Sequence, residues 1–465
     1  MIKTKYILSL LFFLFILFSC NNNSTQKEYL TKKEVEKDCE ELNKYLQDAY
    51  ISYNENLFEN AELANIKKQI INNLKFSDFA GITVQDFQKT IVKELQKNIT
   101  IPDFHLSIFS ELSYDNIFAH QDVYFTDITL YEKNGVYYVS KDYDENIKKS
   151  DIYTGSPDNL FRIFQKDGTI AFQYGVKTSQ KIKSCNISIN NQNYLIKVLS
   201  QKELTSDFYS YNENKENIYI QDDTIFITNL DFYNPQSYLS KMPVSAEELR
   251  NYNVVIDLEN NSGGNTKTCL NYLDFILFAQ KEAENLEVFE KIESTDKQIL
   301  ISSQIWDANY ELSKNLGTNR RKLAVMNIIR GIYKLFHIKY IYSPKNQDLK
   351  RSVFSKYFYP KNIIIVMNKN TSSAAELLIA DLYELAGEKV ITIGENSAAC
   401  VSFMGNYRYM LPNSKIGICL SNVDDRNLKQ FKNPKFMGEL KGFQPDYWIV
   451  ENDLYEHIRH IIKSM

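Results

Sequence analysis

Two adjacent serines, Ser372 and Ser373, lie where a hydroxyl group could act as a nucleophile. They follow an unbroken apolar run, residues 363–367, which predicts a strand buried on both faces, and they precede a segment with helical periodicity. At the first turn of a helix, free backbone N–H groups and the positive end of the helix dipole stabilise developing negative charge. A serine there can also simply cap the helix, which is the commoner role.

Acyl transfer needs a nucleophile, a base that takes its proton, and N–H donors that face the oxyanion. If Ser373 is the nucleophile, the N–H of the next residue, Ala374, is one candidate donor. A glycine turn after the predicted strand 254–258 offers the N–H of Gly263 or Gly264 as a second. Glycine suits this role because the backbone approaches a substrate closely only where no side chain intervenes.

Histidine is well suited to act as the base, because its ordinary pKa lies near neutral pH. His105 stands in residues 103–109, whose alternation predicts a strand with His105 on one face and Phe104 on the other. The alternative for His105 is a strand histidine that faces solvent or has a polar partner. The remaining histidines have no motif around them, which favours a structural role for each: His120, His337, His457 and His460.

Secondary-structure patterns divide the chain before the serines into two regions. Residues 29–102 have helical periodicity in three segments, and Thr83 can cap the third of them with Asp86 three positions on. Residues 103–221 predict strands separated by Gly, Asn and Asp turns. Within them, residues 137–200 have the length of a peptide-binding PDZ-type module but lack its carboxylate-binding loop. We therefore expect a helical N-terminal region and a β-rich region that resembles a degenerate PDZ module.

From residue 222 onward, strands alternate with helices, as in an α/β domain. Residues 222–465 therefore predict an α/β core, with a partly helical insertion at about residues 278–358. A hairpin is predicted for residues 407–420, and a last strand (445–450) and a helix (453–463) follow. The expected class is α/β (α+β).

Composition limits the partners that the chain can have. With 465 residues, 44% hydrophobic and 24% charged, the chain is long enough for about two to three globular domains. A net charge of −4 leaves no basic excess to neutralise phosphates, so a nucleic-acid partner is not expected. The basic run Arg320-Arg321-Lys322 is best explained as a solvated helix face.

The first twenty residues predict a targeting segment, followed by a polar linker over residues 21–28. Two lysines precede an apolar core, and a small residue precedes Cys20. This resembles the lipobox of bacterial lipoproteins, in which the chain is cut before the cysteine and its thiol is acylated, although Phe18 is bulkier than the usual residue. An uncleaved anchor helix is the alternative, but the apolar run is short for a span. The resemblance implies a lipid anchor on Cys20 in the bacterial cell envelope. The expected location of the protein is the outer membrane, on the side that faces the periplasm.

Cysteine spacing predicts no metal site. The cysteines other than Cys20 form neither a CxxC motif nor a Cys/His pair: Cys39, Cys185, Cys269, Cys400 and Cys419. We therefore expect no metal and no cofactor. One disulfide could form in an oxidising compartment, but the spacing does not identify its partners.

Four separated segments together resemble the C-terminal processing (tail-specific) serine peptidases and the related tricorn core peptidase. They are residues 255–264 (VIDLENNSGG), 371–376 (TSSAAE), 393–395 (IGE) and 442–446 (GFQPD). In the family the corresponding motifs read IDLRxNxGG, SAxE, IGE and GVxPD, in this order. Residues 103–105 (DFH) also resemble an upstream DxH element of many members. Each segment alone is weak, but together they are specific and span more than half of the mature chain.

This resemblance implies a serine endopeptidase that cleaves peptide bonds in extended or C-terminal segments of peptide or protein substrates through an acyl-enzyme on Ser373. It also implies a ClpP/crotonase-like ββα superhelical core. One branch of the family uses a Ser/Lys dyad, but Ala399 and Cys400 stand where its Gly and Lys are expected. The tricorn-like branch uses Ser, His, Ser and Glu. In that branch His105 would be the base and Glu439, three positions before Gly442, would orient it.

Several departures from the family pattern leave a second reading open. The family's Arg is Glu259 here, its glycine after the IGE strand is Ala399, and the Ser before its His is Phe104. Lys389 precedes the strand and would point elsewhere, and Cys400 has no positive neighbourhood that would make it a nucleophile. Because retinoid-binding proteins of the eye use the same domain, the alternative is a catalytically inactive module that binds a peptide or a small hydrophobic ligand.

Overall fold

The structure is a computed structural model that describes residues 28–76, 81–111, 113–165, 167–199, 217–233, 242–278, 290–294, 297–315, 317–343, 346–350, 360–449 and 454–464. The chain divides into two compact units. Unit 1 comprises Met1–Phe118, Gln298–Pro344 and Phe403–Asp424, and unit 2 comprises Ala119–Lys297, Lys345–Ser402 and Asp425–Met465. The expected lipobox with Cys20 lies outside the described residues.

The helices of unit 1 begin where the sequence places capping residues. Thr31 Oγ1 accepts the N–H of Glu34 (3.3 Å), and the Glu34 carboxylate accepts the N–H of Thr31 (2.9 Å). Thr83 Oγ1 accepts the N–H of Asp86 (3.0 Å), which confirms the predicted cap. The helices are α2 (Lys32–Ala49), α3 (Tyr53–Glu59), α4 (Ile66–Asn73), α5 (Val84–Asn98), α9 (Ser303–Asn315) and α10 (Arg320–Leu335).

Two four-stranded sheets complete unit 1, in the orders β21-β22-β3-β4 and β16-β15-β23-β20, beside the pair β1-β2. The core joins segments far apart in sequence, since Leu42 of α2, Ile108 of β3 and Ile418 of β22 are all fully buried in one cluster. The strands are β1 (Tyr29–Leu30), β2 (Ile82–Thr83), β3 (Ser107–Phe109), β4 (Tyr114–Asn116), β15 (Gln298–Ser302), β16 (Lys339–Tyr342), β20 (Phe403–Met404), β21 (Tyr407–Met410), β22 (Gly417–Leu420) and β23 (Val423–Asp424). The predicted hairpin is confirmed, because β21 pairs with β22 in antiparallel register.

The strand predicted for residues 103–109 is shorter in the structure, and His105 is not on it. Only Ser107–Phe109 form β3, while Phe104 and His105 lie in a turn. The cause is Asp103, whose carboxylate accepts the N–H of His105 (2.9 Å) and whose carbonyl accepts the N–H of Leu106 (3.1 Å). These bonds fold the backbone locally before it can pair with another strand.

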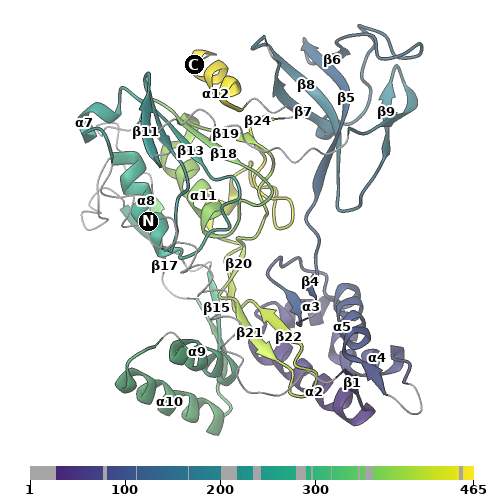
Figure 1. Ribbon diagram of the computed structural model, residues 1–465, viewed down its shortest axis with the longest axis vertical. Coiled ribbons are helices and arrows are strands. Elements are labelled where there is room, and N and C mark those ends of the chain that lie inside the picture. Colours follow the sequence, from purple (N-terminus) through teal and green to yellow (C-terminus); the bar gives the residue numbers. More distant parts are fainter. Residues whose placement is uncertain are drawn as a thin grey trace. The chain divides into compact units, whose positions relative to one another are not determined.

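A ten-stranded sheet dominates unit 2, in the order β11-β12-β13-β18-β19-β24-β7-β8-β5-β6 (Figure 1). Strands β12 to β7 in this order run parallel, and the outer strands are antiparallel. Its strands are β5 (Asp122–Lys133), β6 (Val136–Val139), β7 (Leu160–Phe164), β8 (Ile170–Thr178), β11 (Ile218–Gln221), β12 (Thr224–Ile227), β13 (Asn253–Asp257), β18 (Ile363–Met367), β19 (Val390–Gly394) and β24 (Tyr447–Trp448). The central strand β18 is buried at every position, as its apolar run predicts.

Helices of unit 2 pack around this sheet and bury its central strand. Ile364 and Val366 of β18 pack with Ile458 of α12. Helix α11 packs against α8, and Cys269 Sγ of α8 donates to the Ala374 carbonyl (3.2 Å). The helices of unit 2 are α7 (Ala246–Leu249), α8 (Lys267–Phe278), α11 (Ala374–Ala386) and α12 (Leu454–Ser464). The predicted mixed α/β class is confirmed.

Two small strand pairs lie outside the large sheet. They are β9 (Ser184–Ile189) with β10 (Gln192–Lys197) and β14 (Glu290–Ser294) with β17 (Asn346–Lys350). The β5 to β8 strands of the expected PDZ-like region join the ten-stranded sheet. Cysteines 39, 185, 269, 400 and 419 are all free thiols in the structure. Within the described residues, no helix is both long enough and apolar enough to span a bilayer.

Candidate active site

Ser373 occupies a sharp turn between strand β18 and helix α11, with a backbone conformation that side chains rarely adopt. Its φ and ψ are 57° and −120°. This conformation costs a non-glycine residue about 1–3 kcal/mol, so it persists only where the surrounding structure enforces it. In α/β-hydrolases the nucleophilic serine occupies a strained strand-to-helix turn of this kind, because the turn exposes the hydroxyl at the end of the sheet.

The turn that carries Ser373 is held by the turn that follows β13. Thr371, fully buried, donates its hydroxyl to the Leu258 carbonyl (2.7 Å) and accepts the N–H of Asn368 (3.0 Å). The Ser372 N–H donates to the Asn261 carbonyl (3.0 Å). The parallel pairing of β13 with β18 brings the carboxyl ends of both strands to one edge, where these bonds form.

Gly263 lies against the backbone of Ser373. A Cβ atom on Gly263 would come within 2.5 Å of the Ser372 carbonyl oxygen and 2.6 Å of the Ala374 nitrogen. The φ of Gly263 is +77°, a second reason why a side chain is excluded. The glycine therefore lets the two turns touch.

Two backbone N–H groups beside Ser373 have no acceptor among the residues that the structure describes. The N–H of Gly263 already donates to Asn261 Oδ1 (3.0 Å). For the N–H groups of Gly264 and Ala374, no acceptor is found in the part of the chain that the structure describes. Of the three donors that the sequence suggests, only Gly263 has an acceptor within the described ranges.

Glu376, in the first turn of α11, ties the nucleophile turn to the segment after β19. Its carboxylate accepts the N–H groups of Ser373 (3.2 Å), Ala399 (2.8 Å) and Cys400 (2.7 Å), and it also accepts the Ser397 hydroxyl. Burial raises the pKa of Glu376, and these four donors oppose that rise. The sequence motif contained Glu376 without indicating this role, because its partners lie in a segment that follows another strand.

Ala399 and Cys400, which the sequence resemblance aligns with a Gly and a Lys, lie in this same segment. Ala399 has a φ of +62°, a conformation that glycine adopts without strain. Cys400 follows it and is buried. The backbone geometry that a glycine would serve is thus present, with an alanine in it.

The GFQPD segment is attached to the same loop. The Phe443 N–H donates to Ser397 Oγ (2.8 Å), and the Ser397 N–H donates to the Phe443 carbonyl (3.1 Å). Gly442, with φ +67°, passes so close to Ser397 that a Cβ would lie 2.3 Å from its carbonyl oxygen. Asp446 accepts the N–H of Thr392 (2.9 Å), which joins β24 to β19. These residues position the loop.

Glu439 lies between Gly438 and Leu440 in the turn that precedes GFQPD. Its Oε2 accepts the N–H of Ser402 (3.2 Å), and the side chain is half-buried. Both Gly438 (φ +96°) and Leu440 (φ +69°) have left-handed backbone conformations. Glu439 therefore lies in a tightly curved segment of unit 2.

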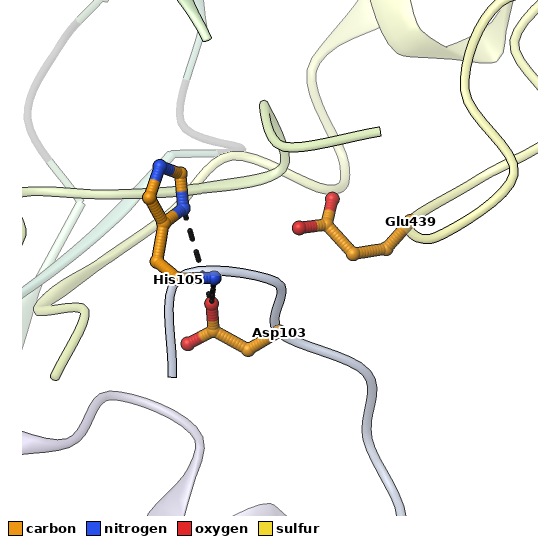
Figure 2. Close-up of side chains that lie close together, drawn as sticks. All are labelled: Asp103, His105 and Glu439. Atoms are coloured by element: carbon orange, nitrogen blue, oxygen red, sulfur yellow. Dashed lines mark hydrogen bonds and ion pairs between the residues drawn. The ribbon is translucent and has the colours of Figure 1, made fainter. Parts of the chain in front are cut away.

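His105 lies in unit 1, on the turn that Asp103 holds (Figure 2). Its Nδ1 is 3.9 Å from Asp103 Oδ1, too long for a hydrogen bond. Burial lowers the pKa of His105 to about 4, against a weaker opposing effect of a hydrogen bond to the Phe403 backbone. Burial likewise raises the pKa of Asp103 to about 7. His105 is consequently neutral at pH 7, although its pKa is not the ordinary one assumed from the sequence.

His120 also contacts the segment after β19, which the sequence did not reveal. Its Nε2 lies 2.9 Å from the Ser397 carbonyl and 3.0 Å from Asn396 Nδ2, and its Nδ1 lies 3.3 Å from Asp122 Oδ1. The hydrogen bond from His120 lowers the pKa of Asp122. Since Ser397 and Asn396 are about 280 positions away in the chain, no local motif marks them.

The structure thus gathers most of the candidate residues in one unit. Ser373, Ala374, Gly263 and Gly264 lie together on the two turns, and Glu439 belongs to the same unit. His105 belongs to the other unit. The pairing of His105 with Ser373 stays a prediction.

Solved structures of several peptidases and proteases are similar to this chain, at low identity. A putative peptidase from Parabacteroides merdae is 10% identical over 94% of this chain and 96% of its own, with a TM-score of 0.42. A photosystem II D1 C-terminal processing protease is 10% identical over 92% and 96%, with a TM-score of 0.34. The tricorn protease is 12% identical over 93% of this chain and 37% of its own, with a TM-score of 0.38. No family model and no curated protein matches the sequence.

Proposed function

We propose that this protein is a serine endopeptidase that cleaves peptide bonds through an acyl-enzyme on Ser373. The observation that carries the proposal is the backbone of Ser373, with a φ of 57° at the end of a buried strand and the start of a helix. A serine that only caps a helix has an extended backbone and needs no such strain. The N–H groups of Ala374 and Gly264, which have no acceptor in the described part of the chain, would be the donors that a tetrahedral intermediate requires.

The proposed reaction uses these groups in two steps. Ser373 Oγ attacks the carbonyl carbon of the scissile peptide, and its proton passes to His105. The new oxyanion accepts hydrogen bonds from the N–H groups of Ala374 and Gly264. The C–N bond then breaks as His105 gives the proton to the leaving amine. Water hydrolyses the ester by the same route, with Glu439 orienting the imidazole.

Peptide hydrolysis tests this proposal. Purified protein is incubated with a library of extended peptides, and new termini are identified by mass spectrometry. We expect cleavage by the wild type and by Ser372→Ala, and none by Ser373→Ala. Ser372 is the matched control, since it is the neighbouring serine and only its backbone groups form hydrogen bonds in the described structure. If Ser373→Ala cleaves as fast as the wild type, the proposal is wrong.

A non-catalytic binding module is the second candidate, and the observation that favours it is the buried Cys400 at the position of the family's lysine. In that case Ser373→Ala would leave the binding of a peptide or small hydrophobic ligand unchanged, and no peptide would be cut. Isothermal titration with peptides of the library distinguishes the two functions. Binding without turnover, with equal affinity for both variants, would support the module.

We also propose that the mature protein is held in the bacterial cell envelope by a lipid on Cys20, facing the periplasm. The support is the lipobox-like sequence, in which Cys20 follows an apolar segment and a small residue. Metabolic labelling with an alkyne fatty acid tests this. The wild type should incorporate label and Cys20→Ser should not, whereas Cys39→Ser, the matched control, should label normally. Equal labelling of Cys20→Ser would exclude lipidation at this residue.

A further inference from the structure

Helix α10 of unit 1 carries an apolar stripe that no described part of the chain covers. The stripe consists of Val325, Ile328, Ile332, Leu335 and Phe336, whose side chains are between 45% and 73% exposed. The first four are spaced three or four positions apart, so they lie along one side of the helix, and Phe336 follows at its C-terminal end. A helix face that is exposed only to water does not normally carry five large apolar side chains along one side.

The opposite side of α10 is attached to α9 (Figure 1). Lys334 Nζ pairs with Asp307 (2.7 Å), and the Arg330 guanidinium lies 4.2 Å from the ring centre of Tyr310. The rings of Trp306 and Tyr333 are 5.8 Å apart. These contacts fix the orientation of α10 within unit 1 and direct the stripe away from α9.

Three cations stand at the N-terminal end of the same helix. Arg320, Arg321 and Lys322 are all exposed, and none has an ion-pair partner among the described residues. The first turn of α10 contains no acidic residue. Positive charge is unfavourable there because the helix dipole is positive at its N-terminus, so an external anion would relieve the repulsion.

We propose that α10 docks onto an anionic phospholipid surface, with its apolar stripe in the acyl boundary and Arg320-Arg321-Lys322 against the headgroups. A basic amphipathic helix with an exposed apolar face is the pattern of interfacial membrane binding. Charge complementarity distinguishes this surface from a second copy of the chain. The α10 of a second copy has no acidic side chain to offer these cations, whereas lipid phosphates do.

Vesicle cosedimentation tests the proposal with the chain from Asn21, which keeps every described residue and lacks the expected lipid. We expect binding at least about tenfold tighter to vesicles of phosphatidylcholine with phosphatidylglycerol than to phosphatidylcholine alone, weakened by salt. Ile328→Ser with Ile332→Ser should abolish binding, and Arg320→Gln with Arg321→Gln should remove the preference for anionic vesicles. Leu195→Ser with Ile170→Ser changes exposed aliphatic residues of unit 2 and should bind like the wild type.

Several outcomes would overturn the proposal. They are no vesicle binding by the wild type, equal binding to both kinds of vesicle, or unchanged binding by the Ile328/Ile332 variant. Circular dichroism of each variant shows whether it is folded, and Ile328→Lys replaces the serine pair if that variant unfolds. Light scattering gives the mass in solution, and a dimer that only the Ile328/Ile332 change dissociates, without vesicle binding, would assign the stripe to a second copy.

Discussion

Ser373 has a backbone conformation that its own sequence neighbours do not require. A serine in the left-handed half of φ space is strained, and the cost of about 1–3 kcal/mol must be offset by the bonds around it. Those bonds are visible in the Thr371 hydroxyl, in the Glu376 carboxylate and in the close approach of Gly263. This combination holds Ser373 in the backbone conformation on which its proposed role as a nucleophile rests.

Peptidase activity should decline on the acid side only at a pH far below the ordinary pKa of histidine. Burial lowers the pKa of His105 from 6.5 to about 4, so the folded protein keeps this imidazole neutral between these values. Because the unfolded chain binds the extra proton in this window, the contribution of His105 to stability is lost as pH falls from 6.5 to about 4. We expect kcat/KM for a cleaved peptide to hold from neutral pH down to about 5 and to halve near 4.

This pH profile needs a folding control. Circular dichroism at each pH identifies where the protein unfolds, and only points in the folded range count. An acid limb near pH 6.5 in folded protein would mean that the base is exposed or is not His105.

At the residue scale, the sequence predicted which residues to consider but not their local geometry. The turns that contain Ser373 and the glycine pair could be predicted from residue spacing, since short motifs encode such turns. The turn at His105 was not, because alternating apolar residues favoured a strand and the Asp103 bonds overrode that pattern. The pKa of His105 depends on burial, which local sequence does not determine.

The two turns at the ends of β13 and β18 act as one element. Each contributes backbone groups that the other turn binds, such as the Ser372 N–H and the Asn261 carbonyl. The Glu376 carboxylate extends this element to the loop after β19. A substitution in any one of the three segments should therefore alter the backbone geometry of Ser373.

Gly263→Ala should disrupt this element more than backbone strain alone explains. Gly135 is the matched control, because it also has a φ of +77° but a Cβ atom added there would meet nothing within 4 Å. We expect Gly135→Ala to lower the free energy of unfolding by about 1–2 kcal/mol with activity unchanged. Gly263→Ala should lower it by about 1–3 kcal/mol more and abolish peptide cleavage, because Ser372 and Ala374 must move. Urea denaturation measures the free energy of unfolding, and the peptide assay measures activity. Equal losses of both in the two variants would contradict the close contact of Gly263 with the backbone of Ser372 and Ala374.

At the element scale, the sequence predicted most helices and strands near the site correctly. Long apolar runs such as β18 and capped helices such as α5 are determined by local patterns. Strands β5, β6, β7 and β8 join the core strands in one sheet. The sequence did not predict this, because pairing between distant strands leaves no local signal.

For the whole molecule, the proposed nucleophile and the proposed base belong to different units. Ser373 and Glu439 belong to unit 2 and His105 to unit 1. Each unit takes non-contiguous segments of the chain, which the sequence, read region by region, did not reveal. If the proposed mechanism holds, catalysis needs both units.

Non-additivity of variants tests whether residues of the two units act together. Ser373→Ala and His105→Ala should each lower kcat by a factor on the order of 10⁴, and the double variant should be no slower than either. His460→Ala is the matched control, since it removes a histidine of helix α12 in unit 2, and should retain activity. Single-turnover cleavage of one peptide measures these rates. Losses that multiply in the double variant would mean that His105 acts independently of Ser373.

If Ser373 is an activated nucleophile, as proposed, a fluorophosphonate should label it covalently, and this measurement needs no knowledge of the substrate. The probe should attach to the wild type and to Ser372→Ala, with the adduct located on Ser373 by mass spectrometry of the digested protein. Ser373→Ala, folded as judged by circular dichroism, should remain unlabelled. An unlabelled wild type, or an adduct of equal yield in Ser373→Ala, would contradict the role of Ser373 as the nucleophile.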